Sequence, residues 1–238
     1  MRIKDEIVDI NENLTSKFWE NRAKKGLTLK TVLLNEELED DILYKRNLKE
    51  LNIVKSILPQ EPQILDIGCG FGRWAENLKD EITYYQGIDY AESLINIAQK
   101  RFKQNNNINF VKMSISKLDE KQLLSSYYNM AIVTGVLMYI NDKDIFEILD
   151  FINTYITDTI YIQESISKNS RLTLDNIYSE NLNDNYSAIY RTKDEYEKFF
   201  IYKLNNFTIK TSDLLLDEDM TSHKETNARY WVLKRIQK

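Results

Sequence analysis

The length, composition and charge of the chain exclude several classes of protein. It has 238 residues, of which 42% are hydrophobic and 29% charged, the composition of a globular protein that can bury a sizeable core. The formal net charge of −5 argues against a nucleic-acid partner, because binding phosphates requires a basic face. The charged N-terminus is unlike a signal peptide, the longest apolar stretch, 130–140, is too short to cross a bilayer, and the single cysteine indicates a reducing compartment. We therefore expect a cytoplasmic protein without a membrane segment, and the oligomeric state stays open.

Strands and helices are predicted to alternate through the middle of the chain. Apolar side chains recur at helical spacing over 38–58, with Tyr44, Leu48 and Val54 expected on one face, and Pro59 follows. The elements that come next are strands at 63–67, 83–88, 108–112, 129–134 and 158–163, and helices at 72–79, 91–103, near 120–126 and at 142–155. Strands separated by helix-length segments predict parallel pairing with right-handed crossovers, and hence a doubly wound, Rossmann-like α/β sheet.

The alternation ends after residue 163. A polar, tyrosine-rich stretch at 165–191 precedes a helix at 192–201, whose start carries the capping-box pattern of Thr192 and Glu195. Two strand-like runs, Phe207–Leu214 and Arg229–Ile236, predict a terminal hairpin that brings the sheet to seven strands, with one antiparallel strand near the C-terminus. We expect one domain over 1–238, made of a helical N-terminal cap at 1–60, a core at 61–163, a lid and substrate region at 164–206 and the hairpin at 207–238.

A glycine-rich loop follows the first strand of the core. Residues 64–72 read Ile-Leu-Asp-Ile-Gly-Cys-Gly-Phe-Gly. Gly68, Gly70 and Gly72 thus stand between a strand and a helix, where missing side chains let the backbone turn tightly and approach a ligand. A loop that binds a dinucleotide would read G-x-G-x-x-G/A, but Arg73 follows the third glycine and is too large for the close helix packing of that motif. An NAD(P)-dependent oxidoreductase is therefore the weaker of two interpretations.

Two acidic residues accompany the loop. Asp66, two residues before Gly68, suits the cationic amino-acid end of S-adenosylmethionine and would repel a pyrophosphate. Asp89 ends the second predicted strand, where a carboxylate can accept both hydroxyls of a ribose, although that would also suit NAD. Glycines alone would be compatible with a structural turn, and the strand with both acids favours a cofactor loop.

With these residues, the segment 60–163 resembles class I S-adenosylmethionine-dependent methyltransferases of the small-molecule type. Residues 110–115 resemble the motif that receives the adenine, with Ser114 in place of the usual aspartate and the amide of Ile115 available. Residues 129–140 resemble the fourth strand and its turn, with Tyr139 where many members have histidine. The resemblance implies S-adenosylmethionine as cofactor, S-adenosylhomocysteine as product, and cofactor contacts from Trp19, Arg22, Arg46, Asp66, Gly68, Cys69, Gly70, Arg73, Trp74, Asp89, Tyr90, Ser114, Ile115, Thr134, Gly135 and Val136.

The same comparison excludes two subclasses. The chain has no Asn/Asp-Pro-Pro-Tyr run, with which DNA methyltransferases hold an exocyclic amine. Thr134 stands where catechol-type enzymes have an acidic residue that helps to bind magnesium, so we predict no metal.

Methyl transfer to oxygen is an in-line displacement, in which alignment contributes much of the catalysis and a base is optional. His223, the only histidine, is the candidate base, Glu164 is expected to orient it or bind substrate, and Tyr139 is a third catalytic candidate. A substrate anion could be held by Tyr190, Arg191 and Lys224. A solvated histidine, a solvated carboxylate and a surface ion pair are the structural alternatives.

The segment before the core carries a further resemblance. Residues 18–22, Phe-Trp-Glu-Asn-Arg, resemble a leader that folds over the cofactor in several bacterial members, with Arg22 or Arg46 meeting the cofactor carboxylate and Trp19 as a packing anchor. Together with 190–192 and 223–231 it resembles methyltransferases of bacterial surface-polysaccharide clusters, including those of O-methyl phosphoramidate. This implies a small acceptor, either a phosphoramidate or a sugar intermediate of capsule modification. A protein that binds S-adenosylmethionine without catalysis is the remaining alternative.

Overall fold

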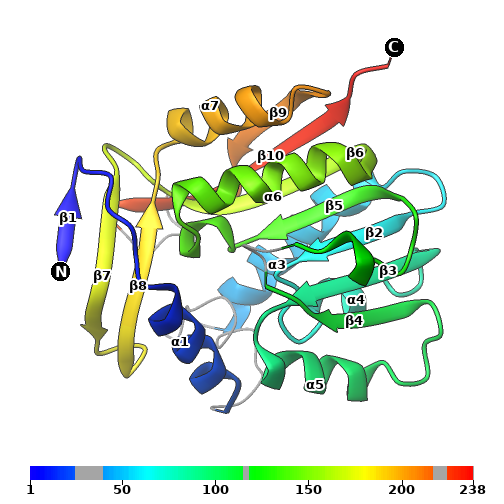
Figure 1. The fold of residues 1–238 in the computed structure, drawn as a ribbon, viewed down its shortest axis with the longest axis horizontal. Coiled ribbons are helices and arrows are strands. Elements are labelled where there is room, and N and C mark those ends of the chain that lie inside the picture. Colours follow the sequence, from blue (N-terminus) through cyan, green and yellow to red (C-terminus); the bar gives the residue numbers. More distant parts are fainter. Residues whose placement is uncertain (25–39, 115–117, 217–223, 238) are drawn as a thin grey trace.

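The structure is a computed structural model that describes residues 1–24, 40–114, 118–216 and 224–237 (Figure 1). Its main sheet has, within these residues, seven strands in the order β4-β3-β2-β5-β6-β10-β9. They are β2 (Gln63–Ile67), β3 (Tyr84–Asp89), β4 (Ile108–Lys112), β5 (Tyr128–Thr134), β6 (Ile156–Ser167), β9 (Phe207–Leu214) and β10 (Thr226–Arg235). The first five pair in parallel, and β10 is antiparallel to both β6 and β9. The predicted doubly wound sheet and its terminal hairpin are confirmed.

Helices cover both faces of this sheet. They are α3 (Asp40–Ile57), α4 (Arg73–Leu78), α5 (Glu92–Arg101), α6 (Asp142–Tyr155) and α7 (Lys193–Lys203), with short 3₁₀ turns at η2 (Glu120–Gln122) and η3 (Leu137–Tyr139). Side chains alternate along the buried strand β5, so that Met130 and Ile132 pack with α3, α4 and α5, whereas Ala131 and Val133 pack with α6 and α7. The site lies where the strand order reverses, between β2 and β5, which is where open α/β sheets bind ligands.

The helix predicted at 38–58 exists, but its buried face differs from the expected one. Val54 is buried as predicted, whereas Tyr44 and Leu48 are 62% and 41% exposed. Leu43 and Glu50 are buried instead. The polar Glu50 occupies an inward position because Arg73 of α4 pairs with it there. An apolar pattern alone could not indicate that contact.

A second, smaller sheet takes two of its strands from the polar, tyrosine-rich stretch at 165–191, where no strand was predicted. It is antiparallel in the order β1-β7-β8, made of β1 (Arg2–Lys4), β7 (Leu172–Ser179) and β8 (Asp184–Tyr190). The helix α1 (Glu12–Lys24) follows β1 and contacts β8. Figure 1 shows α1 and the small sheet on the side toward which the arrows of β4 and β5 point. This sheet and α1 therefore stand next to the carboxyl ends of the parallel strands. No described helix is long and apolar enough to cross a membrane.

Candidate active site

The glycine loop joins β2 to α4 and has a backbone that other residues adopt with difficulty. Gly68, Gly70 and Gly72 have φ angles of 78°, 56° and 87°. A Cβ added at Gly68 would lie 2.2 Å from a methyl carbon of Val136, so the loop touches the turn after β5. At Gly70 and at Gly135 an added Cβ would have no atom within 4 Å. These two positions border open space, which leaves room for a ligand against the backbone.

The carboxylate of Asp89 is fixed beside this loop. One oxygen accepts from the amide of Gly70 and the other from the amide of Ala91, each at 2.9 Å. Burial raises its pKa to about 6, and the backbone N–H donors oppose this shift. Because each carboxylate oxygen can accept more than one hydrogen bond, both retain capacity for hydroxyl groups of a ligand.

Asp66 lies within β2 and is almost completely buried, with an exposure of 1%. The hydroxyl of Tyr85 donates to its Oδ2, whereas its Oδ1 has no hydrogen-bond partner among the described residues. Burial raises the pKa of Asp66 to about 7, and the Tyr85 hydrogen bond opposes this. A buried acceptor without a donor fits a cationic or N–H group of a ligand.

A third group of predicted residues ties α4 to its neighbours. Arg73 donates to Asn47 at 3.0 Å and to Glu50 at 2.9 Å, both on α3. The indole of Trp74 donates to the hydroxyl of Thr134 at 3.1 Å. Arg73 and Trp74 thereby hold the start of α4 against α3 and the end of β5, next to the glycine loop.

The two candidate arginines for a carboxylate lie on different helices. Arg46 is on α3, and burial lowers its pKa against the attraction of Glu50, while Arg73 lowers it further. Its Nε has no hydrogen-bond partner in the described part of the chain. Arg22 on α1 is 1% exposed and donates to the carbonyl of Leu182 at 3.5 Å.

Glu164 of β6 lies beneath the turn after β5 and is fully buried. Its Oε1 accepts from the amides of Val136 at 2.9 Å and Leu137 at 2.8 Å, and its Oε2 accepts from Met138 at 3.2 Å. Burial raises its pKa to about 7, and the three amides and Arg191 oppose this. Its role in catalysis stays a prediction, and in this structure its oxygens bind the backbone.

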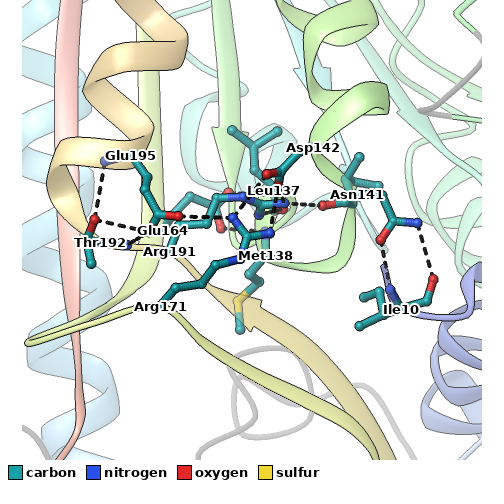
Figure 2. Close-up of polar contacts among 11 residues, drawn as sticks. Ile10, Leu137, Met138, Asn141, Asp142, Glu164, Arg171, Arg191, Thr192 and Glu195 are labelled. Carbon is teal, nitrogen blue, oxygen red and sulfur yellow. Dashed lines mark hydrogen bonds and ion pairs between the residues drawn. The ribbon is translucent and has the colours of Figure 1, made fainter. Parts of the chain in front are cut away.

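Arg191 follows β8 and has no exposed side-chain surface. It donates to the carbonyls of Leu137 at 2.9 Å and Ile140 at 2.7 Å, and its Nε donates to Asp142 at 2.8 Å (Figure 2). Arg171 of the β6–β7 connection also pairs with Asp142 at 2.9 Å. Each guanidinium nitrogen of Arg191 thus donates within the protein.

Sequence reasoning missed this buried cluster. Asp142 and Arg171 have no informative spacing, and Asp142 is in the first turn of α6, where an acidic residue is ordinary. Only the packing of the small sheet against η3 brings the two together.

Tyr139 begins a chain of three hydroxyl groups. Its oxygen lies 3.1 Å from that of Tyr186, which lies 3.1 Å from that of Tyr190. The rings of Trp19 and Tyr186 meet Tyr139 edge to face. Burial raises the pKa of all three tyrosines, so they are neutral near pH 7.

The N-terminal segment contacts both sides of the site, which are the turn after β5 and the segment that follows Asp89. Ile10 and Asn141 exchange two hydrogen bonds, at 2.9 and 3.2 Å, next to the turn after β5. Tyr90, which follows Asp89, donates to the carbonyl of Thr15 at 3.4 Å. The ring of Trp19 meets the rings of Phe18 and Tyr139 edge to face.

The predicted residues that remain are Cys69, Ser114, Ile115, His223 and Lys224. Cys69 is buried and its thiol is 3.6 Å from the carbonyl of Gly70. Ser114 and Lys224 are exposed. Ile115 and His223 lie outside the described residues, so their predicted roles stay predictions. Within the described ranges, no group of three or more His, Cys, Asp or Glu side chains could hold a metal ion.

Known proteins share this fold. Residues 64–157 match the model of a family described as a methyltransferase domain. A SAM-dependent methyltransferase from Leishmania major has a TM-score of 0.69 at 15% identity, with 94% of this chain and 82% of that one covered. Magnesium protoporphyrin IX methyltransferase from Synechocystis, with bound SAM, has a TM-score of 0.61 at 13% identity, with 97% and 100% covered.

A third structure is phosphoethanolamine N-methyltransferase 1 from Haemonchus contortus, in complex with phosphoethanolamine and S-adenosylhomocysteine. Its TM-score is 0.73 at 20% identity, and 95% of this chain aligns with 49% of it, so this chain spans about half of that enzyme. No match was found among curated protein sequences.

The match to a methyltransferase domain thus covers residues 64–157, and the fold of the chain is that of the class I S-adenosylmethionine-dependent methyltransferases. Two of the similar structures hold S-adenosylhomocysteine or S-adenosylmethionine, which agrees with the cofactor that the sequence analysis predicted.

Proposed function

We propose that this protein transfers a methyl group from S-adenosylmethionine to an oxygen of a small molecule. The observation that carries the proposal is the arrangement of two buried carboxylates, Asp66 and Asp89, around a glycine loop that borders open space at Gly70. The turn at Gly135 forms the other wall of the proposed cofactor site, and Gly135 borders open space as well.

The residues present fit the cofactor. Asp66 offers an unpartnered buried oxygen for the ammonium of the amino-acid end, and Asp89 offers two oxygens for ribose hydroxyls. Arg46 and Arg22 are the candidates for the cofactor carboxylate. When bound, the cofactor supplies a methyl group on a cationic sulfur, and in the transfer a new oxygen–methyl bond replaces the sulfur–methyl bond, whose electron pair stays on sulfur.

The hydroxyl chain supports an oxygen acceptor near Tyr139. Tyr139, Tyr186 and Tyr190 carry three protons and share two hydrogen bonds, so one O–H of the three is left over to donate to another group. A neutral tyrosine does not act as a base, but it can align the acceptor oxygen, and alignment contributes much of the rate of such a displacement.

The acceptor class that we propose is a phosphoramidate or sugar intermediate of surface-polysaccharide modification. A phosphoramidate oxygen is already ionised and needs no base, whereas a sugar hydroxyl would lose a proton to a base, for which His223 is the candidate. Tyr190 and Lys224 stay candidates for binding an anionic acceptor. We assign Arg191 to the turn after β5, because its donors bind Leu137, Ile140 and Asp142.

An amine acceptor is the second candidate, because the Haemonchus enzyme of similar fold was solved with phosphoethanolamine. Release of S-adenosylhomocysteine should be measured with phosphoramidates, nucleotide-activated sugars and phosphoethanolamine. Turnover with the first or second class supports the proposal. Turnover with phosphoethanolamine alone would show that the acceptor atom is nitrogen and not oxygen. No turnover with any of these classes would favour a protein that binds the cofactor without catalysis.

The role of Tyr139 has its own test. Tyr139→Phe removes the hydroxyl and keeps the ring, so we expect kcat/KM to fall about 10- to 100-fold, the effect of a lost hydrogen bond to a charged group. Tyr178→Phe is the matched control, since Tyr178 is 58% exposed and its hydroxyl donates to Asn183 on the surface. Equal activity of Tyr139→Phe and the control would remove Tyr139 from the acceptor site.

A further inference from the structure

We infer that Glu164 is a positioning residue: its carboxylate sets the shape of the turn Gly135–Met138, so that cofactor affinity depends on this buried side chain. The inference rests on the proposed function, because it assumes that this turn forms one wall of the cofactor site. It assigns Glu164 a role other than that of a base or a substrate ligand.

Glu164 is the acceptor for three consecutive backbone amides. Val136, Leu137 and Met138 donate to its two oxygens at 2.8 to 3.2 Å. The turn starts at Gly135, whose φ angle is 64°, and the amide of Gly135 donates to the carbonyl of Gln163. Four successive amides of the turn are thus held by Gln163 and Glu164.

The turn packs directly against the glycine loop, so the position of the turn affects that of the loop. A methyl carbon of Val136 would lie 2.2 Å from a Cβ at Gly68, so the two segments are in direct contact. Gly135 itself borders open space. A shift of the turn therefore moves a wall of the cofactor site and the loop that packs on it.

The carbonyl side of the same turn is fixed by Arg191. Arg191 donates to Leu137 and Ile140, and its charge compensates that of Glu164 (Figure 2). The next residue, Asn141, exchanges two hydrogen bonds with Ile10 and so joins the N-terminal segment to the turn. Figure 2 shows Arg191 against the turn, with the hydrogen bonds between Asn141 and Ile10 as a separate pair beside it.

A buried N–H group needs an acceptor, which gives this assignment a specific test. In Glu164→Gln one acceptor oxygen becomes an NH₂ donor that faces a backbone donor. Affinity for S-adenosylhomocysteine, measured by calorimetry on the full chain at pH 8, should fall by roughly 10-fold or more. The amides of Val136, Leu137 and Met138 should exchange hydrogen faster, while exchange in β9 and β10 stays unchanged.

Glu197→Gln is the matched control. Glu197 on α7 accepts from Ser212 of β9 at 2.6 Å and from the indole of Trp231 of β10 at 3.0 Å, and β5 and β6 separate these two strands from β2, which the glycine loop follows. This variant should lose stability and keep the affinity for S-adenosylhomocysteine. If Glu164→Gln does not fold, Glu164→Asp, which keeps the charge on a shorter side chain, provides the same comparison.

The pH profile of affinity adds a second measurement. The groups facing Glu164 are Arg191, Tyr139 and Tyr196, and the pKa values of both tyrosines lie above their ordinary range, so Glu164 is the one that titrates near pH 7. Asp66 and Asp89 titrate nearby, so the expected signal is a weaker pH dependence in Glu164→Gln than in the wild type.

Wild-type affinity in the Glu164 variants, or a loss equal to that of Glu197→Gln, would overturn the inference. Failure of the wild-type chain to bind S-adenosylhomocysteine would instead overturn the proposed function.

Discussion

At the scale of single residues, the site is unusual in burying three carboxylates whose pKa values are raised to about 6 or 7. Burial is the largest cause in Asp66, Asp89 and Glu164. Asp89 and Glu164 each receive backbone amides, whereas Asp66 has one oxygen without a donor. Burying these carboxylates therefore lowers the stability of the ligand-free protein, and a cationic ligand would offset this free-energy cost.

The substitution Asp66→Asn tests whether burial of the Asp66 carboxylate lowers the stability of the ligand-free protein. The pKa of Asp66 is about 7 when folded and has an ordinary value of 3.8, so between these values the folded chain holds a proton that the unfolded chain has lost. Stability from this group therefore falls as pH rises through that range and stays low above it. Asp66→Asn should raise the melting temperature at pH 8 by about 2–4 °C per kcal/mol recovered, with little change at pH 4, while weakening S-adenosylhomocysteine binding. A lower melting temperature at pH 8 would contradict this assignment.

The places of three candidate site residues in the fold could be predicted from residue type and position. Asp66 lies within β2, Gly68 directly follows that strand and Asp89 ends β3, and local sequence carries that information. The partners of Glu164 and Arg191 could not be predicted in this way. Their contacts are to backbone groups of a turn and to Asp142, and only the tertiary fold brings these together.

At the scale of elements, local signals predicted those that are strongly periodic or capped. The helix expected at 142–155 has these bounds in α6, and the capping box of Thr192 and Glu195 starts α7. The helix expected near 120–126 is a 3₁₀ turn over Glu120–Gln122. Strands β7 and β8 were missed because buried and exposed side chains do not alternate regularly along them, and their pairing shifts register between Leu174 and Ile177.

The glycine loop allows a prediction that separates folding from binding. Gly68→Ala combines a positive φ with a Cβ 2.2 Å from Val136, and should destabilise the protein by about 2–5 kcal/mol. Gly70→Ala meets no neighbouring atom, and should cost about 1 kcal/mol for its backbone alone. Its methyl group would enter the cofactor space, so S-adenosylhomocysteine should bind roughly 10-fold more weakly, a loss of about 1.4 kcal/mol.

Thermal unfolding and calorimetry on both variants provide the check. A Gly70→Ala protein with wild-type affinity would show that the loop does not face the cofactor.

At the scale of the whole molecule, the parallel sheet supplies the walls of the site, and chain segments distant in sequence close it. The N-terminal segment is joined to Asn141 on one wall and to Tyr90 on the other, while β8 supplies Tyr186. The sheet order was predictable from alternating elements, because chirality restricts parallel crossovers. The pairing of β1 with β7 was not, since Arg2–Lys4 and Leu172–Leu174 lie at opposite parts of the chain.

The central claim, that the glycine loop with Asp66 and Asp89 binds S-adenosylmethionine and not a dinucleotide, is tested most directly by calorimetry. The full chain should be titrated with S-adenosylhomocysteine and, separately, with NADH. We predict saturable binding of S-adenosylhomocysteine at about one site per chain, and no measurable binding of NADH. Saturable binding of NADH without binding of S-adenosylhomocysteine would contradict the account.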